Sequence, residues 1–490
     1  MKHQHLNYAM LLRVVGGLLA MEALFMIIPF VTCLIFDEDH DALVFGLVAA
    51  GTAVAGLAMM RSLKVHTTRF GKRESYLLTG TVWVVFSLCG MLPFIFGSSQ
   101  LGVSDSFFEA MSGFTTTGAT IRPAGLAPLT HGLMMWQAVM QWLGGMGIIL
   151  FTLAVIPALN SSGGMQMFNA EVPGITHDKI MPRISQTAMS LWGIYASFTI
   201  ILTLLLWFGP MDFYDSICHA MGTISTGGFS TRPDAIAGYD SDYITIVVIL
   251  FMFLGGVNFT LIFNAALGRW RKVRANDIFR LFVGMIFLFT VLFAVAIFAG
   301  GKYDSWRDLT LYPLFQVVST ITSTGYTRPE FLVWGQFVLA LTFIMMFTGG
   351  CAGSTSGGAK IDRLLYLQRH VRNELRRCVH PNAILSVRIN GNVASQELVG
   401  KVISFLALYM IVIVVGGTVL AAMGLPTVDS FFSAFACISN TGFGASVTGY
   451  GDDYALIPDA AKWVLSAMML IGRLEIFTVL VLFTPTFWRR

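Results

Sequence analysis

Four short polar turns hold the residues of this chain that are best suited to chemistry. Each turn ends in glycine and follows an apolar segment of 12 or 13 residues. The turns are Thr116-Thr117-Gly118, Ser225-Thr226-Gly227, Ser323-Thr324-Gly325 and Asn440-Thr441-Gly442. Their hydroxyl and main-chain carbonyl oxygens are the ligand type that hard cations prefer, and glycine reaches backbone angles that turn a carbonyl toward a ligand. The recurrence of the turn at intervals of 109, 98 and 117 residues predicts an internal fourfold repeat.

The composition predicts that these turns lie in a membrane protein. Hydrophobic residues make up 55% of the 490 residues and charged residues 12%, whereas soluble domains are roughly 25% charged. About 20 apolar residues cross a bilayer. Ten segments reach that length: Val14–Phe36, Ala42–Met60, Ser75–Gly97, Gly132–Leu159, Thr187–Met211, Ile244–Gly268, Leu281–Gly301, Phe331–Ala359, Val402–Val428 and Trp463–Trp488. We therefore expect a polytopic, all-α membrane protein.

The charges of the loops predict the orientation. Acidic residues such as Asp37, Asp212 and Asp240 occupy one set of loops, and basic residues follow the second, sixth and eighth segments. The basic residues are Arg61, Lys64, Arg69, Lys72, Arg73, Arg269, Arg271, Lys272, Arg274, Arg280, Lys360, Arg363, Arg369, Arg372, Arg376, Arg377 and Arg388. Basic loops stay in the cytoplasm, so both termini are expected there. These loops also explain the net charge of +4 without a nucleic-acid partner.

The apolar segments before the turns are too short to span a bilayer. A helix of 12 or 13 residues is about 20 Å long, so each segment is expected to be a re-entrant half-helix. The first begins near Ser106, with Glu109 spaced for a capping box. Each half-helix directs the negative end of its dipole toward its turn, which favours a cation. Four such turns on one axis are typical of a pore that replaces the hydration shell of K⁺ with neutral dipoles.

Two features of the later spans break the usual rules of a membrane helix. One stretch contains Gly349, Gly350, Gly353, Ser354, Thr355, Ser356, Gly357 and Gly358. Glycine costs a helix about 1 kcal/mol relative to alanine, so we expect this stretch to unwind and line a cavity; a seam of small residues between helices is the alternative. The second feature is Arg473, because a charge inside a span faces a cavity or a partner, or snorkels to the interface.

These motifs resemble those of the large membrane subunits of bacterial Trk potassium-uptake systems, in the superfamily that includes the Ktr and plant HKT transporters. The resemblance covers residues 70–490, and the two additional spans before residue 62 favour the TrkH type over the shorter Ktr type. It rests on Thr115–Thr120, Ser225–Ser230, Thr322–Thr327 and Ser439–Gly444, which match the family's four filter loops. Glycine in all four loops is typical of the strongly K⁺-selective members.

The resemblance implies an all-α membrane fold of four pseudo-repeats, each a helix, a half-helix pore loop and a second helix, around one central pore. The expected units are a two-helix N-terminal extension at 1–62 and pore repeats at 63–159, 160–268 (which includes a cytoplasmic loop), 269–380 and 381–490. It also implies that residues 349–358 form a gate below the filter. Arg473 is then expected to contact this gate around Ser354–Ser356 and to raise the barrier to cations.

The resemblance also implies the surroundings of the chain. It predicts a multi-pass homodimer in the lipid of the bacterial inner membrane. A cytoplasmic TrkA-type subunit would bind the regulatory nucleotide, because this chain has no Walker A motif or Gly-x-Gly-x-x-Gly in a βαβ context. Arg369, Arg372, Arg376 and Arg377 are candidate contacts for that subunit, although a positive-inside anchor explains them equally well.

Other function classes have less support. An enzyme would need convergent titratable groups, and the sequence has no HExxH or Gly-x-Ser-x-Gly motif; we interpret His219 as a packed or partner-bonded residue and not as a ligand. A symporter that couples K⁺ to H⁺ or Na⁺ is the main alternative to a passive channel. Such carriers commonly use a buried carboxylate, for which Glu22 and Glu475 are the candidates within spans.

Overall fold

The structure is a computed structural model and describes residues 6–62, 71–121, 129–147, 184–301, 303, 305–328, 331, 334–443 and 454–488. These residues are almost entirely helical, which confirms the predicted all-α class. The helices are α1 (Tyr8–Phe25), α2 (Ile27–Ile35), α3 (Asp39–Ser62), α4 (Lys72–Gly90), α5 (Leu92–Phe96), α6 (Val103–Phe114), α7 (His131–Gly145), α10 (Ile184–Trp207), α11 (Phe213–Ile224), η2 (Ala235–Tyr239), α12 (Asp242–Gly256), α13 (Phe259–Ala266), α14 (Trp270–Arg274), α15 (Asp277–Ala299), α16 (Trp306–Leu309), α17 (Leu311–Ile321), α18 (Gln336–Thr348), α19 (Ile361–Val379), α20 (Gln396–Ala422), α21 (Thr427–Ile438), α22 (Asp459–Arg473), α23 (Ile476–Leu480), η4 (Val481–Phe483) and α24 (Pro485–Trp488). Strands β1 (Arg388–Ile389) and β2 (Asn392–Val393) form a short antiparallel hairpin.

Several helices are long and apolar enough to cross a membrane. Within the described residues, six segments meet this criterion alone: Tyr8–Ile35, Asp39–Ser62, Arg73–Phe96, Gln186–Trp207, Asp277–Ala299 and Gln396–Ala422. Two pairs meet it only together, α12 with α13 and α22 with the segment Ile476–Phe483, and they are bent by 109° and 115°. The chain is therefore a multi-pass membrane protein. The predicted span Gly132–Leu159 is described only to residue 147, and Lys64, Arg69 and Gly444 lie outside the described residues.

Two of the predicted spans are not continuous, which corrects the sequence prediction. The span expected at 244–268 breaks at Asn258, whose side chain accepts hydrogen bonds from two backbone N–H groups of the next helix. The span expected at 463–488 stops at Arg473, and Glu475 adopts a left-handed φ of 60° before α23 begins. A cap or a left-handed residue redirects a helix without leaving its end groups unsatisfied.

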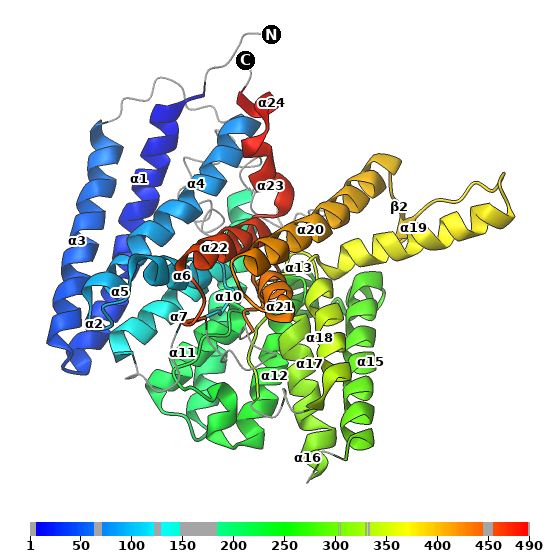
Figure 1. Cartoon of the computed structure of the whole chain (residues 1–490), viewed down its shortest axis with the longest axis horizontal. Coiled ribbons are helices and arrows are strands. Elements are labelled where there is room, and N and C mark those ends of the chain that lie inside the picture. Colours follow the sequence, from blue (N-terminus) through cyan, green and yellow to red (C-terminus); the bar gives the residue numbers. More distant parts are fainter. Residues whose placement is uncertain are drawn as a thin grey trace.

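Four short helices, α6, α11, α17 and α21, lie toward the middle of the molecule (Figure 1). Each packs between two helices of its own unit: α6 between α4 and α7, α11 between α10 and α12, α17 between α15 and α18, and α21 between α20 and α22. The last helix of each unit also packs on the short helix of the next unit: α7 on α11, α12 on α17, α18 on α21, and α22 on α6. Because the last contact joins the fourth unit to the first, the four units close a ring.

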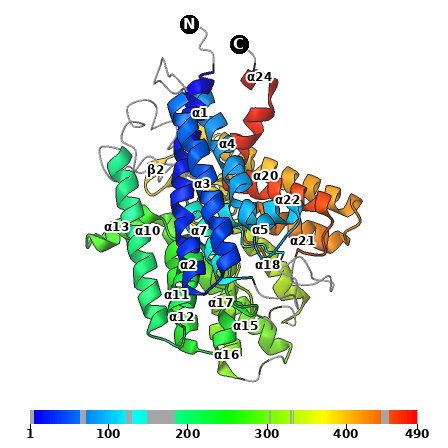
Figure 2. The same cartoon turned by 90° about the vertical axis from the view of Figure 1, so that its left-hand side faces the viewer.

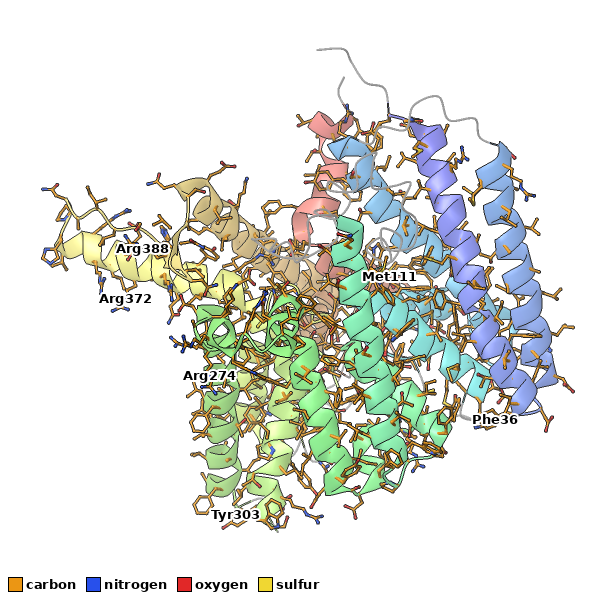
Figure 3. All side chains as sticks on the ribbon, turned by 180° about the vertical axis from the view of Figure 1, so that it is seen from behind. Phe36, Met111, Arg274, Tyr303, Arg372 and Arg388 are labelled. Carbon is orange, nitrogen blue, oxygen red and sulfur yellow. The ribbon has the colours of Figure 1, made fainter. Side chains whose placement is uncertain are left out.

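The remaining elements lie outside this ring. Helices α1 and α3 run side by side along one flank (Figures 1 and 2). On the other flank, α19 and the hairpin form a projecting arm (Figure 1), on which Arg372 and Arg388 lie (Figure 3). The start of α1 and helix α24 lie at one end of the molecule, and Phe36 and Tyr303 lie at the opposite end (Figures 1 and 3).

The packing of α1 on α3 predicts how one glycine contributes to stability. A Cβ atom on Gly56 would lie 2.5 Å from the Gly16 carbonyl oxygen and 2.8 Å from the Ala20 nitrogen. We expect Gly56→Ala to separate the helices and to lower the free energy of unfolding by about 1–3 kcal/mol. Gly51→Ala in the same helix is the control, because no atom lies within 4 Å of its added Cβ. Thermal unfolding in detergent should change for Gly56→Ala alone; equal losses in both variants would contradict this prediction.

Candidate functional site

The four polar turns share one backbone conformation. Two residues after each short helix, Thr116, Thr226, Ser323 and Asn440 have φ values of 53°, 53°, 53° and 51°. Two residues later, Gly118, Gly228, Gly325 and Gly442 have φ values of 80°, 79°, 83° and 63°. A left-handed φ is uncommon for residues other than glycine. Its repetition at the same place in all four loops identifies them as equivalent elements.

This equivalence corrects the predicted register of the second loop by one residue. Gly228, and not Gly227, takes the left-handed conformation of Gly118. Gly227 instead occupies the position of Thr117, Thr324 and Thr441. The sequence predicted Gly227 at this position because Ser225-Thr226-Gly227 is identical to Ser323-Thr324-Gly325, whereas the backbone aligns Thr226-Gly227-Gly228 with that segment.

The four loops touch through glycine and a neighbouring carbonyl. A Cβ atom built on any of the four left-handed glycines would overlap the main-chain oxygen of the next loop. The pairs are Gly118 with Gly227, Gly228 with Thr324, Gly325 with Thr441, and Gly442 with Thr117. Each loop therefore presents one glycine to one neighbour and one carbonyl to the other. The result is a closed ring of four carbonyl groups in which no side chain larger than glycine fits between the loops.

Hydroxyl pairs support three of the loops. The Thr117, Thr324 and Thr441 hydroxyls each lie 2.8 Å from the hydroxyl of the residue two positions earlier. In the second loop, where Gly227 has no side chain, Gln141 of α7 donates a hydrogen bond to the Gly227 carbonyl at 2.7 Å. All of these groups are buried. The site has no carboxylate in its four turns, so its oxygens are neutral dipoles.

Each half-helix has a polar residue nine positions before the left-handed glycine of its loop. These residues are Glu109, His219, Gln316 and Ser433, and each is fully buried. Glu109 accepts hydrogen bonds from the Thr120 hydroxyl at 3.0 Å and from the Ile121 N–H at 3.1 Å. It therefore ties the end of the first loop to its half-helix. The predicted capping box of Ser106 and Glu109 is wrong, because the helix begins earlier, at Val103. The spacing of nine was visible in the sequence, but only after the second loop is aligned on Gly228.

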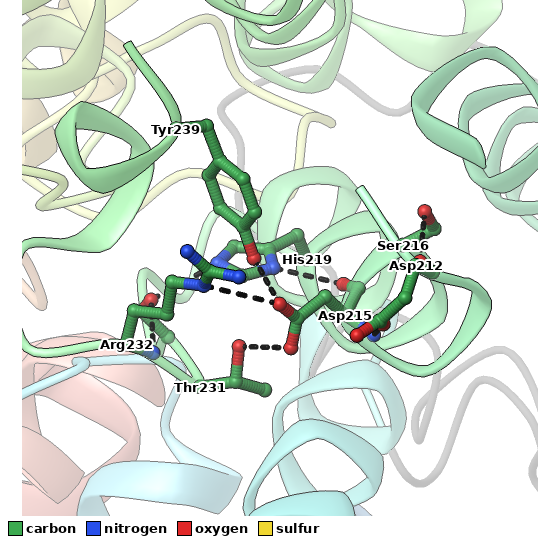
Figure 4. Close-up of polar contacts among 8 residues, drawn as sticks. Asp212, Asp215, Ser216, His219, Thr231, Arg232 and Tyr239 are labelled. Carbon is green, nitrogen blue, oxygen red and sulfur yellow. Dashed lines mark hydrogen bonds and ion pairs between the residues drawn. The ribbon is translucent and has the colours of Figure 1, made fainter. Parts of the chain in front are cut away.

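The second loop is held at its far end by a cluster around Asp215 (Figure 4). The Asp215 carboxylate accepts hydrogen bonds from the Thr231 hydroxyl at 2.6 Å, from Arg232 Nε at 3.2 Å and from the Tyr239 hydroxyl. Burial alone raises the pKa of Asp215, but the hydrogen bonds from Thr231 and Tyr239, together with the favourable charge interactions around the carboxylate, leave the pKa below its usual value. The carboxylate therefore stays charged at neutral pH.

His219 completes this cluster as a structural residue. Its Nδ1 donates to the Asp215 carbonyl oxygen at 2.8 Å, and its Nε2 lies 2.9 Å from the Ser230 hydroxyl (Figure 4). Burial holds the pKa of His219 below its usual value, so the neutral ring accepts from Ser230. Of the two interpretations offered by the sequence, a packed or a partner-bonded histidine, this geometry agrees with the second.

Residues 349–358 form an unwound segment directly after α18. Gly349, Gly353 and Gly358 have left-handed φ values of 65°, 73° and 78°, which a helix does not tolerate. Within the segment, the Ser356 hydroxyl accepts from the Gly350 N–H at 2.9 Å, and the Ser354 hydroxyl lies 3.2 Å from that of Ser356. The predicted loss of helix is therefore present, and the small residues do not form a helical seam.

The unwound segment is bonded to the underside of the loops. The Thr226 hydroxyl donates to the Thr355 hydroxyl at 3.3 Å, and the Gly357 N–H donates to the Ser323 hydroxyl at 2.5 Å. The Thr355 hydroxyl also lies 3.1 Å from the Gly255 carbonyl oxygen, at the break between α12 and α13. Thr226 and Ser323 are the residues with left-handed φ, so this conformation directs their side chains toward the segment.

Arg473 joins three parts of the molecule. Its Nη1 donates to the Thr355 carbonyl of the unwound segment at 2.8 Å. Its Nη2 donates to the Gly144 and Gly145 carbonyls at the end of α7, at 2.5 and 2.8 Å. The guanidinium thus points into the protein beneath the loops and not toward the interface. Glu475 turns away and forms an ion pair with Arg363 at 2.5 Å.

Glu22 lies apart from these loops. It is buried in α1, outside the ring of four units, and both of its carboxyl oxygens lack a hydrogen-bond partner among the described residues. Of the two carboxylates predicted for a coupled carrier, Glu475 is therefore paired, and Glu22 lies in a helix that supplies none of the four loops.

A closed ring of neutral oxygen groups inside a multi-pass helical bundle is typical of membrane proteins that transport cations. The family model for TrkH, described as a cation transport protein, matches residues 46–301 and 307–490. The chain belongs to the TrkH family, which confirms the resemblance drawn from the loops. Members of this family are transporters and not enzymes.

Individual relatives match over nearly the whole chain. The chain is 37% identical over 487 residues to the Trk system potassium uptake protein TrkH of Escherichia coli K12, which covers 99% of this chain and all of that protein. It is 36% identical over 492 residues to the protein of the same name from Vibrio parahaemolyticus, with coverage of 99% and 100%. The crystal structure of the potassium transporter TrkH from Vibrio parahaemolyticus superimposes with a TM-score of 0.88 at 34% identity, covering 99% of this chain and all of that one.

The cluster around Asp215 predicts a pH-dependent contribution to stability. Asp215→Asn should lower the free energy of unfolding by about 1–3 kcal/mol at pH 7, mostly through the Thr231 and Tyr239 bonds, because the Arg232 partner is half exposed and its ion pair is screened. Since the folded pKa is lowered, this contribution exists above the usual carboxyl pKa of about 4 and is lost as the pH falls below it.

Thermal unfolding in detergent between pH 7 and pH 3 measures this difference. The gap in thermal stability between wild type and Asp215→Asn should close as the pH approaches 3. Asp234→Asn, an exposed residue of the same segment, is the matched control and should show no gap. A gap that stays constant over the whole pH range would contradict the assigned role of the carboxylate.

Proposed function

We propose that this chain takes up K⁺ across the bacterial inner membrane through a filter formed by the four loops. The observation that carries the proposal is the closed ring of glycine-to-carbonyl contacts among Gly118, Gly228, Gly325 and Gly442. The relatives named as potassium uptake proteins support the choice of ion. Uptake of a monovalent cation requires ligands that compensate dehydration without binding so strongly that the ion cannot leave.

The filter groups suit K⁺ because they are neutral oxygen dipoles. The carbonyls of Thr117, Gly227, Thr324 and Thr441 would replace the water of hydration, with the three threonine hydroxyls as further oxygens. The four half-helices end at the loops, so the negative ends of their dipoles add a favourable potential for a cation. A glycine at each contact keeps neighbouring carbonyls close, which a larger residue would prevent.

The unwound segment is the proposed gate. It lies beneath the loops and is bonded to Thr226 and Ser323, so an ion leaving the filter would meet it. Arg473 holds the segment through the Thr355 carbonyl and adds positive charge to the same place. Opening would require the segment to give up these bonds, and the left-handed glycines at its two ends are suited to such a change.

The surroundings proposed for the chain follow its loops and its family. The basic loops favour a cytoplasmic location for both termini, and the start of α1 and helix α24 lie at the same end of the molecule (Figure 1). The arm formed by α19 carries Arg369, Arg372, Arg376 and Arg377 and would reach a cytoplasmic TrkA-type subunit that binds the nucleotide. We also propose that two copies of the chain form a homodimer in the lipid bilayer, and that each copy contains the four pore repeats.

Passive conduction fits the described residues better than coupled transport. A coupling carboxylate should titrate or bind an ion near the path, yet Glu475 is paired with Arg363. Glu22 is the feature that favours the alternative, a K⁺/H⁺ or K⁺/Na⁺ symporter, because it is a buried carboxyl without a hydrogen-bond partner in the described part of the chain. Its position in α1, outside the ring, weakens that alternative.

Reconstitution in liposomes and planar bilayers tests the filter. Wild type should give currents that reverse near the K⁺ potential without a gradient of H⁺ or a requirement for Na⁺. Gly325→Ser should lower the K⁺ to Na⁺ permeability ratio by roughly tenfold, or ~1.4 kcal/mol, because the added Cβ overlaps the Thr441 carbonyl at a left-handed φ of 83°. Gly284→Ser, whose Cβ meets no atom within 4 Å, is the control.

Each outcome of that experiment has a clear meaning. K⁺ flux that appears only with an H⁺ or Na⁺ gradient would replace the channel with the symporter, and attention would move to Glu22. An unchanged permeability ratio in Gly325→Ser would remove the third loop from the filter.

The gate is tested separately by Arg473→Ala. Loss of three hydrogen bonds and of a positive charge beneath the loops should release the unwound segment and raise basal K⁺ flux on the order of tenfold. Arg271→Ala, an exposed arginine of α14, is the matched control. Wild-type flux in Arg473→Ala, from protein that remains folded by size-exclusion chromatography, would exclude a role for Arg473 in gating.

A further inference from the structure

The second loop lacks a side chain that the other three loops possess. Thr117, Thr324 and Thr441 each anchor their loop through a hydroxyl pair at 2.8 Å. The equivalent residue of the second loop is Gly227, and Gly228 follows it. Two adjacent glycines have more accessible backbone conformations than a Thr-Gly pair. Without contacts from outside the loop, the second loop would therefore be the least constrained of the four.

Gln141 occupies the space of the missing side chain. Its Nε2 donates to the Gly227 carbonyl at 2.7 Å, and its Oε1 accepts from the Phe229 N–H at 3.2 Å. A Cβ atom on Gly227 would lie 2.7 Å from Oε1 and 2.8 Å from Nε2 of Gln141. The amide therefore stands where a threonine side chain would begin. It is fully buried, and its two hydrogen bonds bracket the loop on both sides of Gly228.

Of the four helices that lie beneath the loops, only α7 has a glutamine at the equivalent position. The residue three positions before the glycine at the end of each helix is Gln141 before Gly144, Met252 before Gly255, Met346 before Gly349, and Met469 before Gly472. All four side chains are buried. The amide occurs in α7, the helix that packs on the half-helix of the second unit, and the methionines occur where the loop has its own threonine.

We propose that Gln141 is a selectivity-determining positioning residue that supplies, from the first unit, the constraint that threonine supplies in the other three loops. This inference rests on the proposed K⁺ filter. The Gly227 carbonyl is one of the four that pack on a neighbouring glycine, so its direction determines one quarter of the ring. A carbonyl oxygen has two acceptor sites; the amide takes one and leaves the other for the ion. Without the amide, the Gly227-Gly228 segment can rotate and offer K⁺ a different oxygen geometry.

The first test is Gln141→Met, which introduces the residue found in the other three helices. Reversal potentials in planar bilayers should show a fall of about fivefold or more in the K⁺ to Na⁺ permeability ratio, the effect expected for one buried hydrogen bond. Met252→Leu, at the same position of α12, should keep the wild-type ratio. Gln141→Leu can neither donate to Gly227 nor accept from the Phe229 N–H, so it should also lower the ratio and serves if Gln141→Met does not fold.

Rescue distinguishes positioning from a general effect on folding. Gly227 does not have a left-handed φ, so its backbone accepts threonine. Gly227→Thr alone should lower the ratio, because its Cβ meets the Gln141 amide. The double variant Gln141→Ala with Gly227→Thr should restore the ratio, since the new hydroxyl can pair with that of Ser225, as in the other three loops.

The outcomes separate this inference from the proposal on which it depends. A wild-type current that does not discriminate K⁺ from Na⁺ would overturn the filter itself. A selective wild type with an equally selective Gln141→Met or Gln141→Leu variant would overturn only the role of Gln141. A double variant that folds but stays as unselective as Gln141→Met would also overturn it, because the missing side chain would then not be what the glutamine replaces.

Discussion

The contact between a glycine of one loop and a carbonyl of the next is the constraint on which the rest of the structure depends. There is no room for a Cβ atom at any of the four contacts, so the loops approach as closely as two backbones can. That approach holds only if all four half-helices end at the same depth and with the same left-handed turn. The conformations at Thr116, Thr226, Ser323 and Asn440 are uncommon for such residues, and their recurrence shows how strictly the ring determines the local backbone.

The same constraint extends one layer below the ring. Gly144 and Gly472 at the ends of α7 and α22 also lack room for a Cβ atom, because the carbonyl oxygens of Phe114 and Ile438 occupy that space. The helices that support the loops therefore lie in backbone contact with the ends of the half-helices, and α7 and α22 both end one residue after this contact. Helix α12 ends shortly before Asn258, and α22 ends shortly before Glu475. The unwound segment lies in the third unit at this level, so among the described residues it is the longest of several breaks and not an isolated irregularity.

Much of this arrangement could be predicted from the sequence, and the failures have physical causes. Length and hydropathy predicted the membrane class, the recurring glycine predicted the loops, and the density of glycine at 349–358 predicted the loss of helix. The register of the second loop was wrong because Gly227 stands for a threonine whose function lies in Gln141, 86 residues earlier. The breaks at Asn258 and Glu475 were missed because the contacts made there, Asn258 with the Ala352 carbonyl and Glu475 with Arg363, join residues far apart in the sequence, which local hydropathy does not record.

Arg473 shows how asymmetry is built on this fourfold plan. Gly145 and Gly256 follow the glycines of α7 and α12 that support their loops, and Arg473 stands at the same position after Gly472 in α22. Its guanidinium reaches across to Gly144 and Gly145 of the first unit and to Thr355 of the third. One planar group with several fixed donors can bond three carbonyls in different directions, which the single ammonium of lysine cannot match in geometry. The fourth unit thus closes the ring and holds the unwound segment through the same side chain, so a movement of α22 would be transmitted to both.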